Sequence, residues 1–441
     1  MSELNDTDAT TGNINIIADP FDPAADRKNP NTQTTYVLER LRAIPAGIIE
    51  SSTGTFFLLI ALQAFQAGPL SKSLIVAGGN IGMLLTPFVV MAVERKGITS
   101  MRAAAGLLLV GAAALTLAAL LPFLPVYVGA VVIAYAITNM VIPLFTPVYQ
   151  SNYPARERGK YVSRSIVVRV AIAAVCGDLV GRMLTADIGL FRVLLVVVAL
   201  AFLASSFIAI RIPSQPLHVR SDIGRSATGT VSWLDSLRQI WFSMSFLKTD
   251  RLFRNTMAAW MFMGFANLIM VPLRIEYLVN PAFGISLNAQ ETAMLTIVIP
   301  SLARLVMSPV FGWIFDRMNF FATRVALNIA FALSIIMFFT GTSTLGLVVG
   351  ALIFGIALAG GDILWSLWVT KFAPPHRVAD YIAVHTFFTG VRGVIAPIIA
   401  FQLITKLPIG EIGIICAVLI GLASLILLPE MKRAMRRTVP S

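Results

Sequence analysis

The sequence predicts an all-α polytopic membrane protein with twelve transmembrane helices in two parallel six-helix repeats. Three observations predict this fold: the composition, the distribution of basic residues, and an internal repeat. The 441 residues are 57% hydrophobic and 13% charged, with a mean hydropathy of +0.81. A soluble domain is about 45–50% apolar and about 25% charged. The composition therefore excludes an ordinary soluble enzyme, and it excludes a disordered chain because apolar residues are too abundant.

The net charge of +12 is also consistent with a membrane protein. In a membrane protein, Lys and Arg gather in cytoplasmic loops, where anionic lipids are their partners. We therefore expect lipid contact at the cytoplasmic face and no nucleic acid. The two cysteines, Cys176 and Cys416, lie in apolar runs. We expect no disulfide framework, no metal site and no cofactor.

Residues 1–37 are polar and rich in Asn, Asp, Thr and Pro. No basic segment followed by an apolar run is present, so we predict a disordered cytoplasmic tail rather than a cleaved signal peptide.

Twelve apolar runs follow the tail, and each is close to the roughly 20 residues that a bilayer requires. The fifth run contains Arg169, Asp178 and Arg182, so a hydropathy window could miss it. The predicted spans are 44–66, 73–93, 103–122, 125–149, 166–183, 190–210, 255–279, 291–314, 325–344, 346–370, 381–405 and 411–429.

Basic residues test this layout. With both termini in the cytoplasm, 26 of the 34 Lys and Arg residues fall on the inner side, five on the outer side and three inside spans. This asymmetry follows the positive-inside rule. We expect a multi-pass protein of the plasma (cell inner) membrane with both termini cytoplasmic.

The spans divide into a six-helix bundle at 38–212 and another at 254–430, followed by a basic cytoplasmic tail at 431–441. The segment 213–253 is predicted as a cytoplasmic linker. Its apolar residues between Trp233 and Leu247 recur at helical spacing. This spacing predicts a short helix at the membrane interface; a flexible loop is the alternative.

The two halves repeat each other at a constant offset of 222 residues. TPFVVMAVERKGITSMR at 86–102 matches SPVFGWIFDRMNFFATR at 308–324. Both copies follow the second span of their half. Because six is an even number of crossings, the two halves share one orientation, which is the parallel-repeat architecture of some transporters.

At these residues the chain resembles the major facilitator superfamily, which carries a Gly-x-x-x-Asp-Arg signature between its second and third helices. The better copy here is the second, at Gly312, Asp316 and Arg317; in the first copy, Val90 replaces the glycine and Glu94 the aspartate. The later Gly-Arg-Lys cluster of the family is missing from both copies. The predicted cytoplasmic gate motif consists of Glu94, Arg95, Arg102, Gly312, Asp316, Arg317 and Arg324.

Physical chemistry gives this motif a role. A carboxylate at a helix end can pair with an arginine or with a helix N-terminus, and such a latch can hold two bundles together in one state. The alternative is a surface ion pair worth about 0–1 kcal/mol.

Ionisable side chains deep in the membrane are the other candidate site. Such residues are costly there and usually face a polar interior. The resemblance places spans 1, 2, 4, 5, 7, 8, 10 and 11 around a central cavity, and every deep charge falls on one of them. The candidate cavity and coupling residues are Glu50, Arg169, Asp178, Arg304, Asp362 and Arg392.

Two interpretations of these charges stay open. An acid could take up a proton during the cycle, and the arginines could bind an anionic substrate. Permanent ion pairs that fix the helices are the alternative, particularly for Asp178 and Arg182 at i and i+4. Trp365 and Trp368 form a candidate substrate wall or are ordinary packing residues. His385 is expected to be a solvated bystander.

The chain has no Walker motif and no signature of a hydrolase. We expect a monomeric secondary active transporter, not an enzyme, that moves a small solute by alternating access, with protons as the coupling ion. The alternatives are a uniporter or drug exporter, and a membrane sensor or scaffold without transport.

Overall fold

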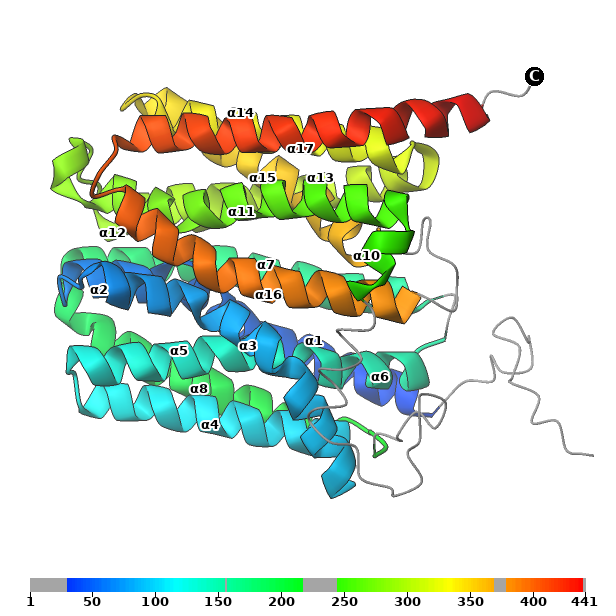
Figure 1. The fold of residues 1–441 in the computed structure, drawn as a ribbon. Helices are drawn as coiled ribbons and strands as arrows, with labels where there is room; N and C mark the ends of the chain where they lie inside the picture. The colour runs from blue at the N-terminus through cyan, green and yellow to red at the C-terminus, as the bar shows by residue number, and fades with distance from the viewer. Residues whose placement is uncertain (1–29, 155–156, 217–243, 369–377, 439–441) are drawn as a thin grey trace, which may run out of the picture.

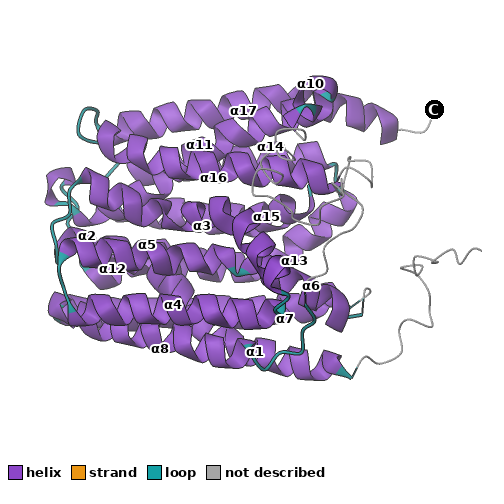
Figure 2. Ribbon diagram, turned by 60° about the horizontal axis from the view of Figure 1, so that its bottom comes forward, coloured by secondary structure: helices purple, strands orange, loops and turns teal. Residues whose placement is uncertain are grey.

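The computed structural model describes residues 30–154, 157–216, 244–368 and 378–438, apart from the side chains of Asp316 and of residues 366, 367, 378–380 and 434–438. The described residues contain long α-helices and no strand (Figure 2). The helices form twelve membrane-length rods. The first six rods are Asn31–Gln63 (α1, η2 and α2), Pro69–Lys96 (α3), Ser100–Leu120 (α4), Leu124–Asn152 (α5 and α6), Arg158–Ala186 (α7) and Phe191–Ala209 (α8). The last six are Arg251–Val279 (α11), Ala289–Arg317 (α12, η5 and α13), Phe320–Phe339 (α14), Thr344–Leu367 (α15), Val378–Leu403 (α16) and Ile409–Thr438 (α17).

Composition explains why these segments are helices of this length. Eleven of the described helices are long and apolar enough to cross a membrane. The rod outside that set is α7, in which every stretch of membrane length holds at least three charged side chains, such as Arg169, Asp178 and Arg182. As expected, hydropathy alone misses this span.

The first six rods form the N-half and the last six the C-half (Figure 1). In each half, the first rod packs on the fifth, the second on the fourth, and the third on the sixth; the pairs are α1–α7, α3–α5 and α4–α8, then α11–α16, α13–α15 and α14–α17. The same pairing in both halves is the structural form of the sequence repeat. Between the halves, α3 packs on α16, and α7 packs on α12 and α13.

The two sides of the helix bundle differ in the segments that lie there. At the termini side, α1 begins and α17 ends (Figure 1). At the opposite side, the connections are short, and two of them contain single 3₁₀ turns, Ile188–Leu190 (η3) and Pro281–Phe283 (η4).

The first rod begins earlier than the sequence predicted. Residues 31–37, expected in the disordered tail, form the first turns of α1. Thr32 donates to the carbonyl of Asn152 at 2.6 Å, and the Asn152 amide donates to Thr35 at 2.9 Å. These polar side chains attach the start of α1 to the end of α6. Because the contacts are polar, hydropathy does not reveal this part of the helix.

The last rod likewise extends further than predicted, because α17 continues through residues 431–438, which were assigned to a basic tail. Of the linker 213–253, residues 217–243 lie outside the described residues, and with them most of the predicted interfacial helix. Its described end is a single helical turn, Phe246–Thr249 (α10).

Candidate functional site

Four of the predicted cavity charges meet between the halves. Glu50 of α1 contacts Arg169 of α7 at 2.8 Å and Arg304 of α13 at 3.3 Å. Arg304 also contacts Asp362 of α15 at 2.6 Å. We call Glu50, Arg169, Arg304 and Asp362 the central network. Its members come from the first and fifth rods of the N-half and the second and fourth rods of the C-half.

Two π-helical turns position this network. The first rod contains Ser52–Phe56 (η2), and the eighth contains Met294–Val298 (η5). The turns face each other across the halves, and Thr55 donates to Thr296 at 3.1 Å. Glu50 precedes the first turn and Arg304 follows the second. Turns of this kind are rare and often mark functional sites in helices.

The charges in the central network balance, with two carboxylates and two guanidinium groups. Glu50 and Asp362 are partly exposed, so the network is not sealed from water. Of the three ion pairs described in this network, the one between Glu50 and Arg304 joins the two halves. The carboxylate of Glu50 thus pairs with one arginine of each half.

The other two predicted cavity charges lie elsewhere. Asp178 pairs with Arg182 at 2.8 Å, one turn away on the same helix, and accepts from Gln290 of the C-half at 3.2 Å. Its ion pair is therefore local, and its hydrogen bond reaches the other half. Arg392 points into the C-half, where it donates to the carbonyl of Trp260.

A second ion pair joins the halves and was not predicted. Lys72 at the start of α3 contacts Glu276 near the end of α11 at 2.8 Å, and both are buried. Asn280 also donates to Glu276, and the ammonium of Lys72 lies 5.1 Å from the ring centre of Phe401. Lys72 is one of the five basic residues that the sequence places on the outer side, and Glu276 is not among the predicted site residues. We call this pair the clamp.

The clamp belongs to a layer of contacts at the opposite side. Ser73 donates to the carbonyl of Pro397 at 3.2 Å, and Thr185 accepts from the backbone of Gln290 at 2.9 Å. Among the described residues, every hydrogen bond and ion pair between the halves lies at the level of the central network or nearer the opposite side. We call the side where these contacts gather the joined side, and the termini side, where the described residues make none of them, the parted side.

The predicted gate motif lies at the parted side. Arg95 and Arg102 are exposed, and the described side chains include no ion-pair partner for Glu94. Arg317 lies over the ring of Trp313, 4.6 Å from its centre. The side chain of Asp316 is outside the described part of the structure, so the predicted latch has no geometry to report for that residue.

Two aromatic predictions need correction. Trp365 is 42% exposed and can line an open space, but Trp368 is 1% exposed and stacks on Phe253 inside the C-half. His385 was expected to be solvated and is instead buried, with its ring 5.0 Å from the Trp368 ring. Trp368 and His385 both lie on the inner face of their helices. Their positions near the ends of predicted spans do not reveal this burial.

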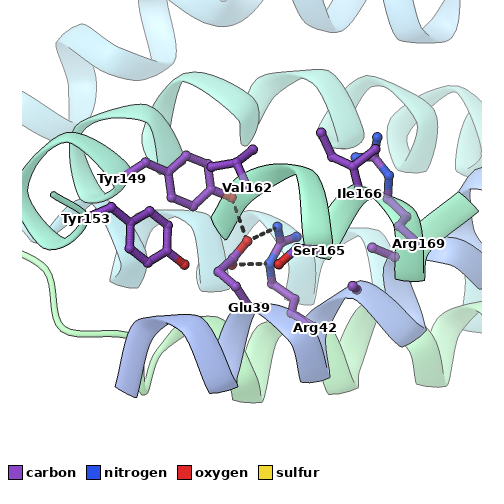
Figure 3. Close-up of a pocket in the computed structure, with 10 residues that line it drawn as sticks. Glu39, Arg42, Tyr149, Tyr153, Val162, Ser165, Ile166 and Arg169 are labelled. Atoms are coloured by element: carbon purple, nitrogen blue, oxygen red, sulfur yellow. Dashed lines mark hydrogen bonds and ion pairs between the residues drawn. The ribbon is translucent and has the colours of Figure 1, made fainter. Parts of the chain in front are cut away.

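A small polar cavity of about 40 Å³ lies within the N-half beside the central network (Figure 3). Glu39 receives two bonds from Arg42, at 2.7 and 3.0 Å, and one from Tyr149 at 2.6 Å. Arg169 lines the cavity and also reaches Glu50. A cavity of this size holds one or a few waters. The sequence reading missed Glu39 and Arg42 because both precede the predicted span.

Comparison with known families identifies this architecture. The model of the Major Facilitator Superfamily matches residues 43–397, and a second match covers 277–441. The chain belongs to the Major Facilitator Superfamily. As a member, it is a multi-pass membrane protein and a secondary transporter rather than an enzyme.

Solved structures show the same fold at low sequence identity. A mutant of the nucleoside transporter NupG has a TM-score of 0.70 and 14% identity, covering 90% of this chain and 99% of that chain. The inward-open xylose transporter XylE from E. coli has a TM-score of 0.64 and 14% identity, covering 90% and 95%. A POT family transporter in complex with a thioalcohol-conjugated peptide has a TM-score of 0.63 and 14% identity, covering 91% and 97%. No curated protein sequence matches this superfamily member.

Proposed function

We propose that this transporter is proton-coupled, works by alternating access and sits in the plasma (cell inner) membrane with both termini cytoplasmic. The observation that carries the proposal is the central network. One of its acids, Glu50, bonds an arginine of its own half and an arginine of the other half. A proton on that carboxylate weakens both bonds, so proton uptake and movement of the halves are linked.

Charge distribution supports the orientation. Exposed basic side chains such as Arg95, Lys96 and Arg433 lie at the termini side, where anionic lipids of a cytoplasmic leaflet would attract them. With that side in the cytoplasm, the joined side faces outward. The polar contacts between the halves then gather on the outer side.

The solute is small, because alternating access around a central network leaves room only for a molecule enclosed by the two halves. The names of the structural neighbours supply a first panel: a nucleoside, D-xylose and a short peptide. At 14–15% identity these neighbours share the fold, and the panel is a starting point for screening.

The test uses purified protein in liposomes with an imposed pH gradient. The parent should accumulate one solute of the panel, or of a wider one, and the gradient should drive accumulation. Glu50→Gln should abolish accumulation and retain counterflow, which needs no net proton movement. Glu411→Gln, an exposed acid at the start of α17, is the matched control and should behave like the parent.

Each alternative has its own outcome. Downhill transport that ignores the gradient would indicate a uniporter and overturn proton coupling. Drug efflux as the sole activity would indicate an exporter. No movement of any solute across a broad panel would favour a sensor or scaffold.

A further inference from the structure

One stripe of α16 carries three polar side chains that face the interior of the C-half. His385, Thr389 and Arg392 lie at i, i+4 and i+7, which places them on one face of the helix. His385 and Thr389 are both buried. The stripe faces α11, since the guanidinium of Arg392 donates to the carbonyl of Trp260 and fills the space beside Gly264.

A second arginine reaches the same tryptophan from α14. Arg324 is 2% exposed, and its guanidinium carbon lies 3.8 Å from the centre of the Trp260 ring. The ring of His385 is 5.3 Å from that of Trp260. The Arg324 guanidinium and the His385 imidazole therefore lie against the Trp260 indole, and the Arg392 guanidinium bonds the backbone of the same residue. The sequence reading assigned Arg324 to the gate motif, at the start of a helix, and did not predict its burial.

Each member of this cluster has a buried polar atom without a hydrogen-bond partner in the described structure. The atoms are Nη2 of Arg324, Nε of Arg392, Nε2 of His385, Nε1 of Trp260 and Oγ1 of Thr389. The described side chains also include no carboxylate paired with Arg324 or Arg392. Unpaired polar groups in a protein interior are costly, and buried positive charges need compensation.

The chemistry of these atoms selects one kind of ligand. Guanidinium and indole groups donate hydrogen bonds, and a hydroxyl can do so as well. We propose that the cluster of Trp260, Arg324, His385, Thr389 and Arg392 is a binding site for a compact anion, either a halide or a single carboxylate group. The anion accepts hydrogen bonds from the donors and neutralises the two arginines. This site is separate from the central network, whose own charges balance.

Another buried arginine of the C-half shows why the cluster is distinctive. Arg274 also has unpaired nitrogens, but it donates to Ser334 at 2.7 Å and lies against the rings of Phe338 and Phe354. It is surrounded by aromatic faces rather than by further donors. At Trp260, by contrast, several donors from three helices meet.

The cluster lies next to a partly exposed residue. Trp365, 42% exposed, has its ring 5.8 Å from that of His385. It follows Asp362 by three residues on α15, which is about one helical turn. An anion bound in the cluster would thus sit beside the helix that carries one acid of the central network.

Binding is tested on the purified, detergent-solubilised full chain, without any transport assay. The protein is prepared in sodium isethionate, and chloride or acetate replaces isethionate at constant ionic strength. The apparent Tm should rise with the added anion and saturate, because a ligand that binds the native state stabilises it. Arg324→Gln and Arg392→Gln should each weaken the apparent affinity at least tenfold. Arg182→Gln, an exposed arginine on α7, is the control and should keep the parent response.

A second measurement tests the proposal even if an arginine variant folds poorly. Iodide in contact with an indole quenches its fluorescence, so a saturable component of quenching should be present in the parent and lost in Trp260→Phe. A response to chloride identifies a halide site, and a response to acetate alone identifies a carboxylate site; both support the proposal. No saturable response in the parent, or an equal response in both arginine variants, would overturn it. Because binding is measured directly, failure of proton-coupled transport would leave this result unaffected.

Discussion

The clamp and the central network both join the two halves through an ion pair, but they differ in their surroundings. Lys72 and Glu276 are buried, and each makes a further contact with its neighbours. Glu50 and Arg304 are partly exposed, and each has a second charged partner within its own half. A buried pair must break as a whole, whereas the members of a shared, wetted network can exchange partners. The clamp therefore suits a contact that holds one state, and the network suits one that responds to protons.

The largest effect is expected from breaking one side of the clamp. Lys72→Met leaves the Glu276 carboxylate buried without its cation, at a cost of about 3–5 kcal/mol. The equilibrium between the two states should shift more than about 100-fold toward an open opposite side. Ser73→Cys is the reporter, because Ser73 is buried between the halves. It should react with an impermeant maleimide much faster in the variant, in a background with Cys176 and Cys416 replaced.

The matched control is the double variant Lys72→Met with Glu276→Leu. Apolar side chains of similar size replace a buried pair with little loss of stability. Labelling at position 73 should return close to the parent rate. If the double variant labels as fast as the single variant, the unpaired Glu276 carboxylate is not what opens the opposite side. The proposed reason for the effect of Lys72→Met would then be wrong.

A smaller effect is expected from the network. Arg304→Gln removes the contact that crosses the halves, and Glu50 keeps Arg169 as a partner. A partly exposed ion pair contributes about 1 kcal/mol or less, so labelling at position 73 should change by no more than about fivefold. A change as large as that of Lys72→Met would show that the two ion pairs hold the halves equally. Burial would then not distinguish the clamp from the network.

Proton dependence should separate the two pairs further. If the network couples protons to movement of the halves, labelling at position 73 in the parent should depend on pH, because a proton on one of its carboxylates removes a charge from its ion pairs. The double variant Glu50→Gln with Asp362→Asn should lose that response. The clamp variants should retain it. A parent whose labelling is independent of pH would remove the network from proton coupling.

Sequence reasoning predicted the helices better than it predicted their partners. Twelve helices, their repeat and the weakness of the fifth span all follow from hydropathy and spacing, because a bilayer imposes helix length directly. Six deep charges were expected to share a cavity, and four of them meet in ion pairs, since charged side chains in a membrane are costly unless they are paired. The failures involve burial near helix ends. Glu276 and Arg324 lie within a few residues of an end, where sequence alone does not distinguish a solvated side chain from one turned inward.

The smallest effect is expected from the gate motif. Glu94 is half-buried at the parted side, and no ion pair to it exists among the described side chains. Glu94→Gln therefore removes nothing that holds this state, and labelling at position 73 should shift by less than about twofold, the size of an ordinary surface change. If the predicted latch forms only when the termini side closes, the same variant should slow transport and should also slow labelling within this limit, because the labelled state is then less populated. Measuring both quantities on one preparation decides the matter. Slower labelling at position 73 would agree with a latch, because loss of a bond made only in the other state favours the present one. Faster labelling would show that Glu94 stabilises the present state, and the latch would then be the wrong description of this motif.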